Sequence, residues 1–229
     1  MTGEYRAPLD PREQTFLIDG GREGLLILLR RLPSAGSANR GPVLYLHGAT
    51  FPSVLSIAYR FSDGSWRDAL CNAGFDVWAL DFLGFGGSDR YPEMEAEAQA
   101  HGPLGLAMEA GDQVEAAARF LLDHDQRQRL APITQSWGSM PAGLFAARCP
   151  TLVDRIVMFA PLARRDGPRY TPRPTLPAWK LVNNEEQWTC FVEDVPLRTA
   201  RALARRFRGL GGGLSRSRPR RTDSNAGCR

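Results

Sequence analysis

Short runs of consecutive apolar residues are separated by longer segments with helical spacing along the first 160 residues. We expect strands at four such runs: residues 42–48, 75–82, 131–136 and 154–161. We expect helices at the three segments between them: residues 62–74, 104–125 and 139–150. Continuous apolar runs are typical of strands buried on both faces of a parallel sheet. The alternation of strands and helices therefore predicts an α/β fold with a mostly parallel, doubly wound sheet.

Two further strands precede this alternation. Residues 13–19 and 24–33 are rich in Leu, Ile and Phe, and the turn-forming segment GGRE at 20–23 lies between them. A short turn of this kind joins antiparallel strands, so the pair is expected to form an antiparallel edge of the sheet.

The character of the sequence changes after Leu162. Residues 163–181 contain four prolines and no strand pattern, residues 183–195 have the composition of a short helix, and no strand-like segment follows Pro196. We therefore expect a core at residues 1–162, the start of a lid or cap at 163–197, and a disordered Arg-rich tail at 198–229. The sheet would then lack its last strands.

Length and charge narrow the class of protein. A chain of 229 residues with 43% apolar residues suits one α/β domain. Residues 198–229 contain ten arginines and one acidic residue, whereas residues 1–197 carry 19 basic and 24 acidic side chains, so the net charge of +4 describes neither part.

No apolar run approaches the roughly 18 residues of a membrane span, and no secretory signal begins the chain, so a cytoplasmic location is expected. The four cysteines have no metal-binding spacing.

The segment TQSWG at 134–138 is the strongest candidate for chemistry. It joins a predicted strand to a predicted helix and approximates the nucleophile-elbow pattern G-x-S-x-G, with Ser136 as the nucleophile. Gly138 fits the pattern, whereas Thr134 is larger than the expected glycine. A serine at a helix start is also a common N-cap, so the motif needs support from its context.

A second loop supplies that context. His47 and Gly48 end the apolar strand that should lie beside the elbow. An oxyanion hole requires two backbone N–H groups directed at developing negative charge, and Trp137 and Ala49 are placed to provide them. Gly48 permits the turn that orients the Ala49 N–H. The competing interpretation is a polar strand end in which His47 is structural.

Three segments together carry a resemblance to a known family. LYLHGATF (44–51), GFDVWALDFLGFGGSDR (74–90) and TQSWGSMPAG (134–143) resemble the α/β-hydrolase fold superfamily in their order and spacing. The resemblance covers roughly residues 14–195. It implies a serine hydrolase that forms an acyl-enzyme on Ser136, with Trp137 and Ala49 as the oxyanion hole and no cofactor or metal. It also implies a lid that begins near residue 163.

The resemblance further implies an acid and a histidine after the nucleophile, and the sequence does not supply them in the usual order. The chain has three histidines, His47, His101 and His124, and all precede Ser136. His101, in a loop, is the candidate base, and Asp166 is the candidate acid. Loss of a triad member leaves only about 10³–10⁴-fold catalysis over water, so we expect little or no turnover from the chain as encoded.

The composition beyond Pro196 suggests a reason for the missing residues. Arginine, glycine, serine and alanine dominate there, and the chain has a single lysine, Lys180, as expected of a GC-rich gene. We hypothesise that the sequence leaves its ancestral reading frame near Pro196. Translation of the coding DNA in all three frames tests this, since the absence of a strand-and-histidine pattern in every other frame would exclude it.

Several functions remain open at this stage. The first is a hydrolase of a small ester, thioester or amide, with an apolar acyl pocket at Phe51, Phe85, Trp137 and Met140. The second is a non-catalytic relative that binds a ligand or partner in the same cleft. The third is an anionic-surface binder that uses Leu203, Phe207 and Leu210 among the tail arginines, although no nucleic-acid partner is expected. Dinucleotide binding at GFGGSD (84–89) is disfavoured, because Asp89 stands where the motif requires glycine.

Overall fold

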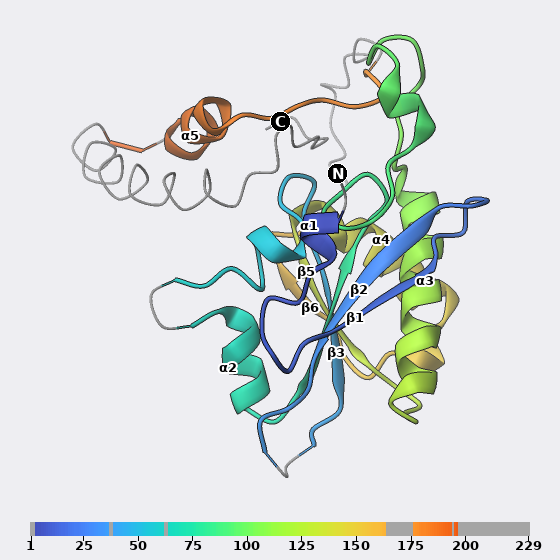
Figure 1. The fold of residues 1–229 in the computed structure, drawn as a ribbon, viewed down its shortest axis with the longest axis vertical. Helices are drawn as coiled ribbons and strands as arrows, with labels where there is room; N and C mark the ends of the chain where they lie inside the picture. The colour runs from blue at the N-terminus through green and yellow to red at the C-terminus, as the bar shows by residue number, and fades with distance from the viewer. Residues whose placement is uncertain (1–2, 37–38, 62–63, 164–175, 194, 197–229) are drawn as a thin grey trace.

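A six-stranded mixed sheet forms the centre of the computed structural model, which describes residues 3–36, 39–61, 64–163, 176–193 and 195–196 (Figure 1). The strands are β1 (Gln14–Asp19), β2 (Leu26–Leu32), β3 (Pro42–Leu46), β4 (Asp76–Asp81), β5 (Ala131–Gln135) and β6 (Val157–Phe159). Their order across the sheet is β1-β2-β4-β3-β5-β6. Strands β3 to β6 run parallel, and β2 pairs antiparallel with both β1 and β4. The predicted α/β sheet with an antiparallel edge is confirmed.

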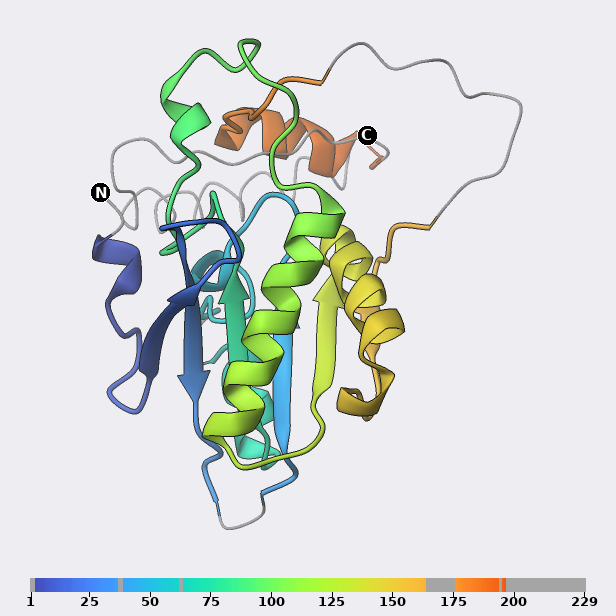
Figure 2. The same ribbon diagram turned by 90° about the vertical axis from the view of Figure 1, so that its right-hand side faces the viewer.

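Helices cover both faces of this sheet. Helices α3 (Ala107–His124) and α4 (Ser139–Arg148) pack on one face, and α2 (Trp66–Asn72) lies on the other (Figure 2). The remaining helices are α1 (Gly3–Arg6), α5 (Asn184–Val192) and the short 3₁₀ turns η1 (Ser53–Leu55), η2 (Pro92–Glu95), η3 (Ser136–Gly138) and η4 (Pro150–Leu152). The doubly wound arrangement follows from the buried strands, since each face of β3 and β4 needs an apolar cover.

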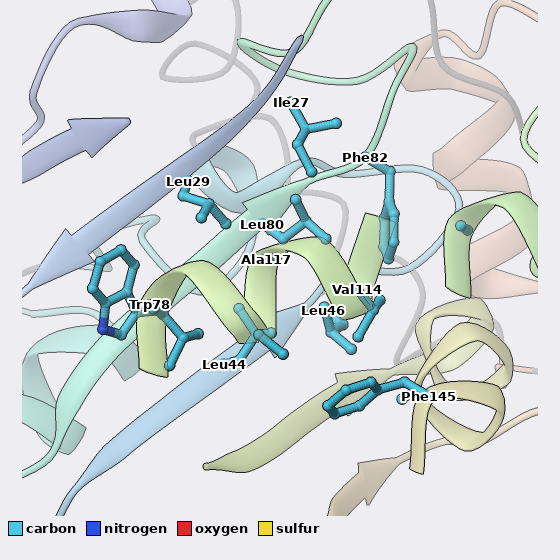
Figure 3. Close-up of a cluster of buried hydrophobic side chains, with 14 of the residues drawn as sticks. Ile27, Leu29, Leu44, Leu46, Trp78, Leu80, Phe82, Val114, Ala117 and Phe145 are labelled. Atoms are coloured by element: carbon cyan, nitrogen blue, oxygen red, sulfur yellow. The ribbon is translucent and has the colours of Figure 1, made fainter. Parts of the chain in front are cut away.

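Alternate residues of the central strands feed two separate cores. The larger core, beneath α3 and α4, joins the sheet residues Ile27, Leu29, Leu44, Leu46, Trp78 and Leu80 to Val114, Ala117 and Phe145 (Figure 3). The smaller core, beneath α2, contains Leu32, Val43, Tyr45, Val77, Ala79, Ile57 and Cys71. Because successive side chains of a strand point to opposite faces, a continuous apolar run fills both cores at once.

Helix α2 begins later than the sequence predicted. The expected helix spanned residues 62–74, with a start signal at Ser62 or Asp63, two residues that lie outside the described part of the chain. The helix starts at Trp66 with Ser65 as its N-cap. The Ser65 hydroxyl accepts from the Asp68 N–H, and the Asp68 carboxylate accepts from the Ser65 N–H. This reciprocal capping box satisfies two helix-terminal donors, so it decides the helix start over the earlier Ser-Asp pair.

Strand β6 is an apolar strand that lies largely open to solvent. Val157, Met158 and Phe159 are 52%, 42% and 53% exposed, and among the described residues β6 pairs only with β5. The Phe159 ring contacts Trp66 of α2, which is itself exposed, at a centroid distance of 5.9 Å. An open apolar strand edge is a template for pairing with further chain.

Residues 176–193 lie beyond the carboxyl ends of the parallel strands. The Ala178 N–H donates to the Ala98 carbonyl, and the Ala178 carbonyl accepts from the Leu104 N–H. This segment is therefore hydrogen-bonded to the loop before α3. Helix α5 also lies on the side of the sheet where the parallel strands end, as both views show (Figures 1 and 2). The tail positions Leu203, Phe207 and Leu210 lie outside the described residues. None of the described helices is both long and apolar enough to cross a membrane.

Candidate functional site

Ser136 occupies a strained backbone position between β5 and α4. Gln135 is extended, with φ −121° and ψ 130°, and Ser136 turns into the left-handed region at φ 48° before the helix begins. Residues other than glycine, asparagine and aspartate rarely adopt this conformation, and the strain costs about 1–3 kcal/mol. The Ser136 side chain is half-buried, and its hydroxyl forms no hydrogen bond to any residue that the structure describes.

Two glycines allow the end of β3 to approach this turn. A Cβ at Gly138 would lie 2.6 Å from the carbonyl oxygens of both Leu46 and His47, so only glycine fits there. A Cβ at Gly48 would lie 3.4 Å from the Ser136 Cβ, which places the loop after β3 directly against Ser136. Strands β3 and β5 are neighbours in register, with Leu46 opposite Thr134, so the two loops leave the sheet side by side.

Thr134 shows how the turn tolerates a departure from the strict motif. Its side chain is fully buried, and its hydroxyl has no hydrogen-bond partner among the described residues. An unsatisfied buried hydroxyl costs about 1–3 kcal/mol. The larger side chain is thus accommodated inside the sheet packing, and it does not prevent the turn at Ser136.

Two backbone N–H groups near Ser136 have no hydrogen-bond acceptor in the described part of the chain. The N–H groups of Ala49 and Trp137 donate to no described carbonyl or side chain. Trp137 lies in the first turn of η3, where N–H groups have no partner within the helix. Its ring packs edge-on against Phe82 at 5.3 Å, which fixes the residue beside β4. An oxyanion hole requires backbone N–H groups that are not already hydrogen-bonded, and both of these meet that requirement among the described residues.

His47 is a buried structural histidine. Its Nδ1 lies 2.6 Å from the Gly48 carbonyl oxygen, and its Nε2 accepts from the Phe82 N–H at 3.2 Å. The ring packs against Phe82 and Phe85 at centroid distances of 5.0 and 4.9 Å. Burial lowers the pKa of His47, and the negative charge of Asp81 opposes this only in part. Both ring nitrogens are occupied, so His47 cannot accept the Ser136 proton.

The buried neutral His47 predicts a pH-dependent stability. The unfolded chain binds a proton at this residue near pH 6.5, and burial lowers the pKa of His47 in the folded protein, so stability falls as the pH drops below that value. Between pH 7.5 and pH 5 we expect a loss of up to about 1.4 kcal/mol per pH unit, measured by urea denaturation. His47→Asn should reduce the dependence, and His101→Asn at an exposed loop position should retain it. An unchanged slope in His47→Asn would contradict this assignment.

The other candidate acid–base residues do not come together at Ser136 in the described part of the chain. His101 is exposed, and no hydrogen bond joins it to Ser136. His124 ends α3 and bonds to Asp125, with its ring against Phe16 and Trp78. Asp166 lies outside the described residues.

The glycine-rich loop after β4 is held by a buried carboxylate. Asp81 is fully buried and accepts from the N–H groups of Ser53 and Gly87 at 2.7 and 3.0 Å. A Cβ at Gly86 would lie 2.1 Å from an Asp81 oxygen, and Gly86 has φ 50°, so glycine is needed there for close approach. Asp81 therefore links this loop to the η1 turn, and the carboxylate that Gly86 and Gly87 approach would repel a phosphate.

The apolar residues expected at the acyl pocket divide into two groups. Phe85 is buried against His47 and Trp137 is half-buried, so both belong to the packing beneath the site. Phe51, in the loop after β3, is 38% exposed, and Met140, in the first turn of α4, is 43% exposed. No group of three or more His, Cys, Asp or Glu residues in the described ranges is arranged to hold a metal ion.

Comparisons with solved structures return α/β proteins of limited similarity. A predicted CIB-like hydrolase from Thermoplasma acidophilum is 22% identical, with a TM-score of 0.47, over 65% of this chain and 63% of that one. A probable hydrolytic enzyme from Pseudomonas aeruginosa PAO1 is 26% identical, with a TM-score of 0.46, over 69% and 45%. A thioesterase domain from the curacin biosynthetic pathway is 17% identical, with a TM-score of 0.49, over 78% and 50%. The chain thus spans about half to two-thirds of the length of these structures.

A comparison of the sequence with models of protein families identifies the family of the chain. No curated protein matches the chain significantly. The family model described as alpha/beta hydrolase fold matches residues 41–205, which include the loop after β3, the loop after β4 and the turn at Ser136. The match covers more than half of the chain. The chain belongs to the alpha/beta hydrolase fold family.

Proposed function

We propose that the protein descends from a serine hydrolase of small esters, thioesters or amides and retains its nucleophile, Ser136. The observation that carries the proposal is the left-handed backbone of Ser136 at the junction of β5 and α4. A fold keeps a backbone strain of this size where the surrounding packing imposes it, and such strain is concentrated at functional sites. Here it occurs at a half-buried serine directly after the carboxyl end of β5.

The proposed reaction uses the groups around Ser136 in sequence. The Ser136 oxygen attacks the substrate carbonyl carbon, and the N–H groups of Ala49 and Trp137 stabilise the resulting oxyanion. The leaving group then departs with a proton, and water hydrolyses the acyl-enzyme in a second addition. Because no histidine of the described chain reaches Ser136, the serine proton must pass to hydroxide or another external base, so the rate at neutral pH should be low.

Covalent labelling tests the nucleophile directly. We expect a fluorophosphonate to modify Ser136 in the full chain at a rate that rises with pH up to pH 9, because hydroxide serves as the base. Intact mass and peptide mapping locate the adduct. Ser136→Ala should abolish labelling, and Ser34→Ala, beside Asp76 at the amino end of β4, should leave it unchanged. Equal labelling of Ser136→Ala and the unmodified chain would exclude Ser136 as the nucleophile.

A non-catalytic binding protein is the second candidate. The observation that favours it is the same absence of a base beside Ser136 among the described residues. In that case esters of short acyl chains would bind without release of the alcohol. Detection of a stoichiometric burst of p-nitrophenol from p-nitrophenyl butyrate at pH 9, lost in Ser136→Ala, would distinguish the acyl-enzyme from binding alone.

A further inference from the structure

The Gly48–Ala49 peptide is the group whose orientation decides whether a second oxyanion donor exists. No peptide bond in the described chain is cis, so the Gly48 carbonyl and the Ala49 N–H point in opposite directions from one planar unit. A flip of this peptide would change ψ of Gly48 and φ of Ala49 together, and Gly48, which has no side chain, offers little resistance to its share of the change. A contact to the Gly48 carbonyl therefore helps to hold the orientation in which the Ala49 N–H is left without a partner.

The His47 ring contacts the carbonyl end of this peptide. Its Nδ1 lies 2.6 Å from the Gly48 oxygen, which can only accept a hydrogen bond, so Nδ1 must carry the proton. Its Nε2 lies 3.2 Å from the Phe82 nitrogen, which can only donate, so Nε2 must carry the lone pair. The two bonds together specify one neutral tautomer and tie the loop after β3 to the first residue after β4.

The surroundings of the ring prevent it from turning away. His47 is fully buried, and the aromatic rings of Phe82 and Phe85 pack against it at 5.0 and 4.9 Å. A flip of the Gly48–Ala49 peptide would break the Nδ1 bond and leave a buried ring N–H without an acceptor, at a cost of about 1–3 kcal/mol. The opposite end of the peptide, the Ala49 N–H, remains without a partner among the described residues.

We infer that His47 is a positioning residue: its Nδ1–H holds the Gly48 carbonyl so that the Ala49 N–H faces the oxygen of a carbonyl under attack by Ser136. The inference rests on the proposed function, and it assigns to the His47 ring a role separate from that of a general base. It also explains why a histidine, with one donor and one acceptor on a rigid ring, stands at this strand end.

Two substitutions separate the two hydrogen bonds. In His47→Asn the amide nitrogen is the same number of bonds from the backbone as Nδ1, so the donor to the Gly48 carbonyl is retained. In His47→Gln the amide oxygen matches the position of Nε2, so the acceptor for the Phe82 N–H is retained and the donor is lost. Both substitutions remove aromatic packing, so both are expected to lower the unfolding temperature.

The fluorophosphonate labelling rate of Ser136 at pH 9 provides the kinetic readout. Loss of one oxyanion donor reduces rates by about 10²–10³-fold, so we expect His47→Gln to label about 100-fold more slowly than the unmodified chain. His47→Asn should remain within about threefold of it, by the same reasoning. If the unmodified chain labels and both variants label equally, whether fast or slow, the positioning role is wrong and Ser136 remains the nucleophile. If the unmodified chain does not label, the proposed function itself fails.

A measurement on the unmodified protein keeps the inference testable even if a variant does not fold. In ¹⁵N-histidine-labelled protein at pH 8, the ring nitrogen shifts of His47 should report a neutral ring protonated at Nδ1. A neutral ring protonated at Nε2 would overturn the inference, because Nδ1 could then not donate to the Gly48 carbonyl.

Discussion

Replacing Gly138 with alanine is expected to destabilise the protein by about 3 kcal/mol and to slow the labelling of Ser136 by about 100-fold. The added Cβ would lie 2.6 Å from two carbonyl oxygens, those of Leu46 and His47, and neither can move without displacing the end of β3. The strain is relieved only if the turn at Ser136 separates from the loop after β3. That separation would increase the distance between the nucleophile and the proposed donor at Ala49.

Gly143 provides the matched control for this substitution. It lies in α4, five residues further along, and a Cβ there would have no atom within 4 Å. Alanine is favoured over glycine in a helix by about 1 kcal/mol, so Gly143→Ala should stabilise the protein slightly and leave labelling unchanged. Urea denaturation and the labelling rate measure the two effects. If Gly138→Ala were as stable as Gly143→Ala, the close approach of the two loops would be wrong.

The parallel core of the fold could be predicted because its signals are local. Strands β3 and β4 are continuous apolar runs, and every residue from Pro42 to Leu46 and from Asp76 to Asp81 is buried. The connection between β1 and β2, residues 20–25, contains the glycine-rich turn expected at residues 20–23. Since a buried parallel strand needs apolar residues on both faces, such runs have few alternative interpretations.

The start of α2 was predicted incorrectly because two overlapping capping signals compete there. Ser62 and Ser65 are both acceptable N-caps by residue type. Only Ser65 is followed three residues later by an acidic side chain, Asp68, that returns a hydrogen bond to it. The S-x-x-D spacing was visible in the sequence and would have identified the correct start.

The internal contacts of the site could not be read from the sequence. The bonds of the His47 ring depend on Phe82, which is 35 residues away and adjacent only after β3 and β4 have paired. The strain at Ser136 likewise depends on how β5 meets α4. The roles of Ser136, Ala49 and Trp137 therefore remain proposals to be tested by labelling, whereas those of His101 and Asp166 remain predictions from the sequence alone.

A buried ion cluster was also absent from the sequence predictions. Glu13 lies between Arg30 of β2 and Arg67 of α2. One carboxylate oxygen accepts a hydrogen bond from the Arg30 guanidinium, and the other accepts one from the Arg67 guanidinium. Both arginine side chains are 1% exposed. Charged residues are rarely buried, so sequence position alone gives no reason to place three of them inside the fold. The one available signal was the pair Arg30 and Arg31 within the otherwise apolar run of β2.

Replacing Glu13 with alanine is expected to destabilise the protein by about 3–5 kcal/mol. The substitution leaves the guanidinium groups of Arg30 and Arg67 buried without a counter-charge. Three of their nitrogens already lack hydrogen-bond partners among the described residues, so the site has no spare acceptor to compensate. Urea denaturation at pH 7.5 measures the loss.

Glu115 offers a control with the same chemistry at the surface. It pairs with Arg119 one helical turn away in α3, where the arginine side chain is 60% exposed. Exposed pairs of this type contribute about 0.3–0.5 kcal/mol, so Glu115→Ala should cost roughly a tenth of the loss in Glu13→Ala. Similar losses for the two variants would show that the Glu13 cluster is not buried in the way the structure describes.

The triple variant Glu13→Leu, Arg30→Met, Arg67→Met separates the cost of burying charge from the need for these side chains to fill space. Replacing a buried ion cluster by apolar residues of similar volume is often neutral or stabilising, so most of the stability lost in Glu13→Ala should return. Strands β4 and β3 lie between β2 and the strand that carries Ser136. The triple variant should therefore label at the rate of the unmodified chain. If it is as unstable as Glu13→Ala, the cluster contributes specific hydrogen bonds, such as that from Arg30 to the Ala7 carbonyl, that apolar packing cannot replace.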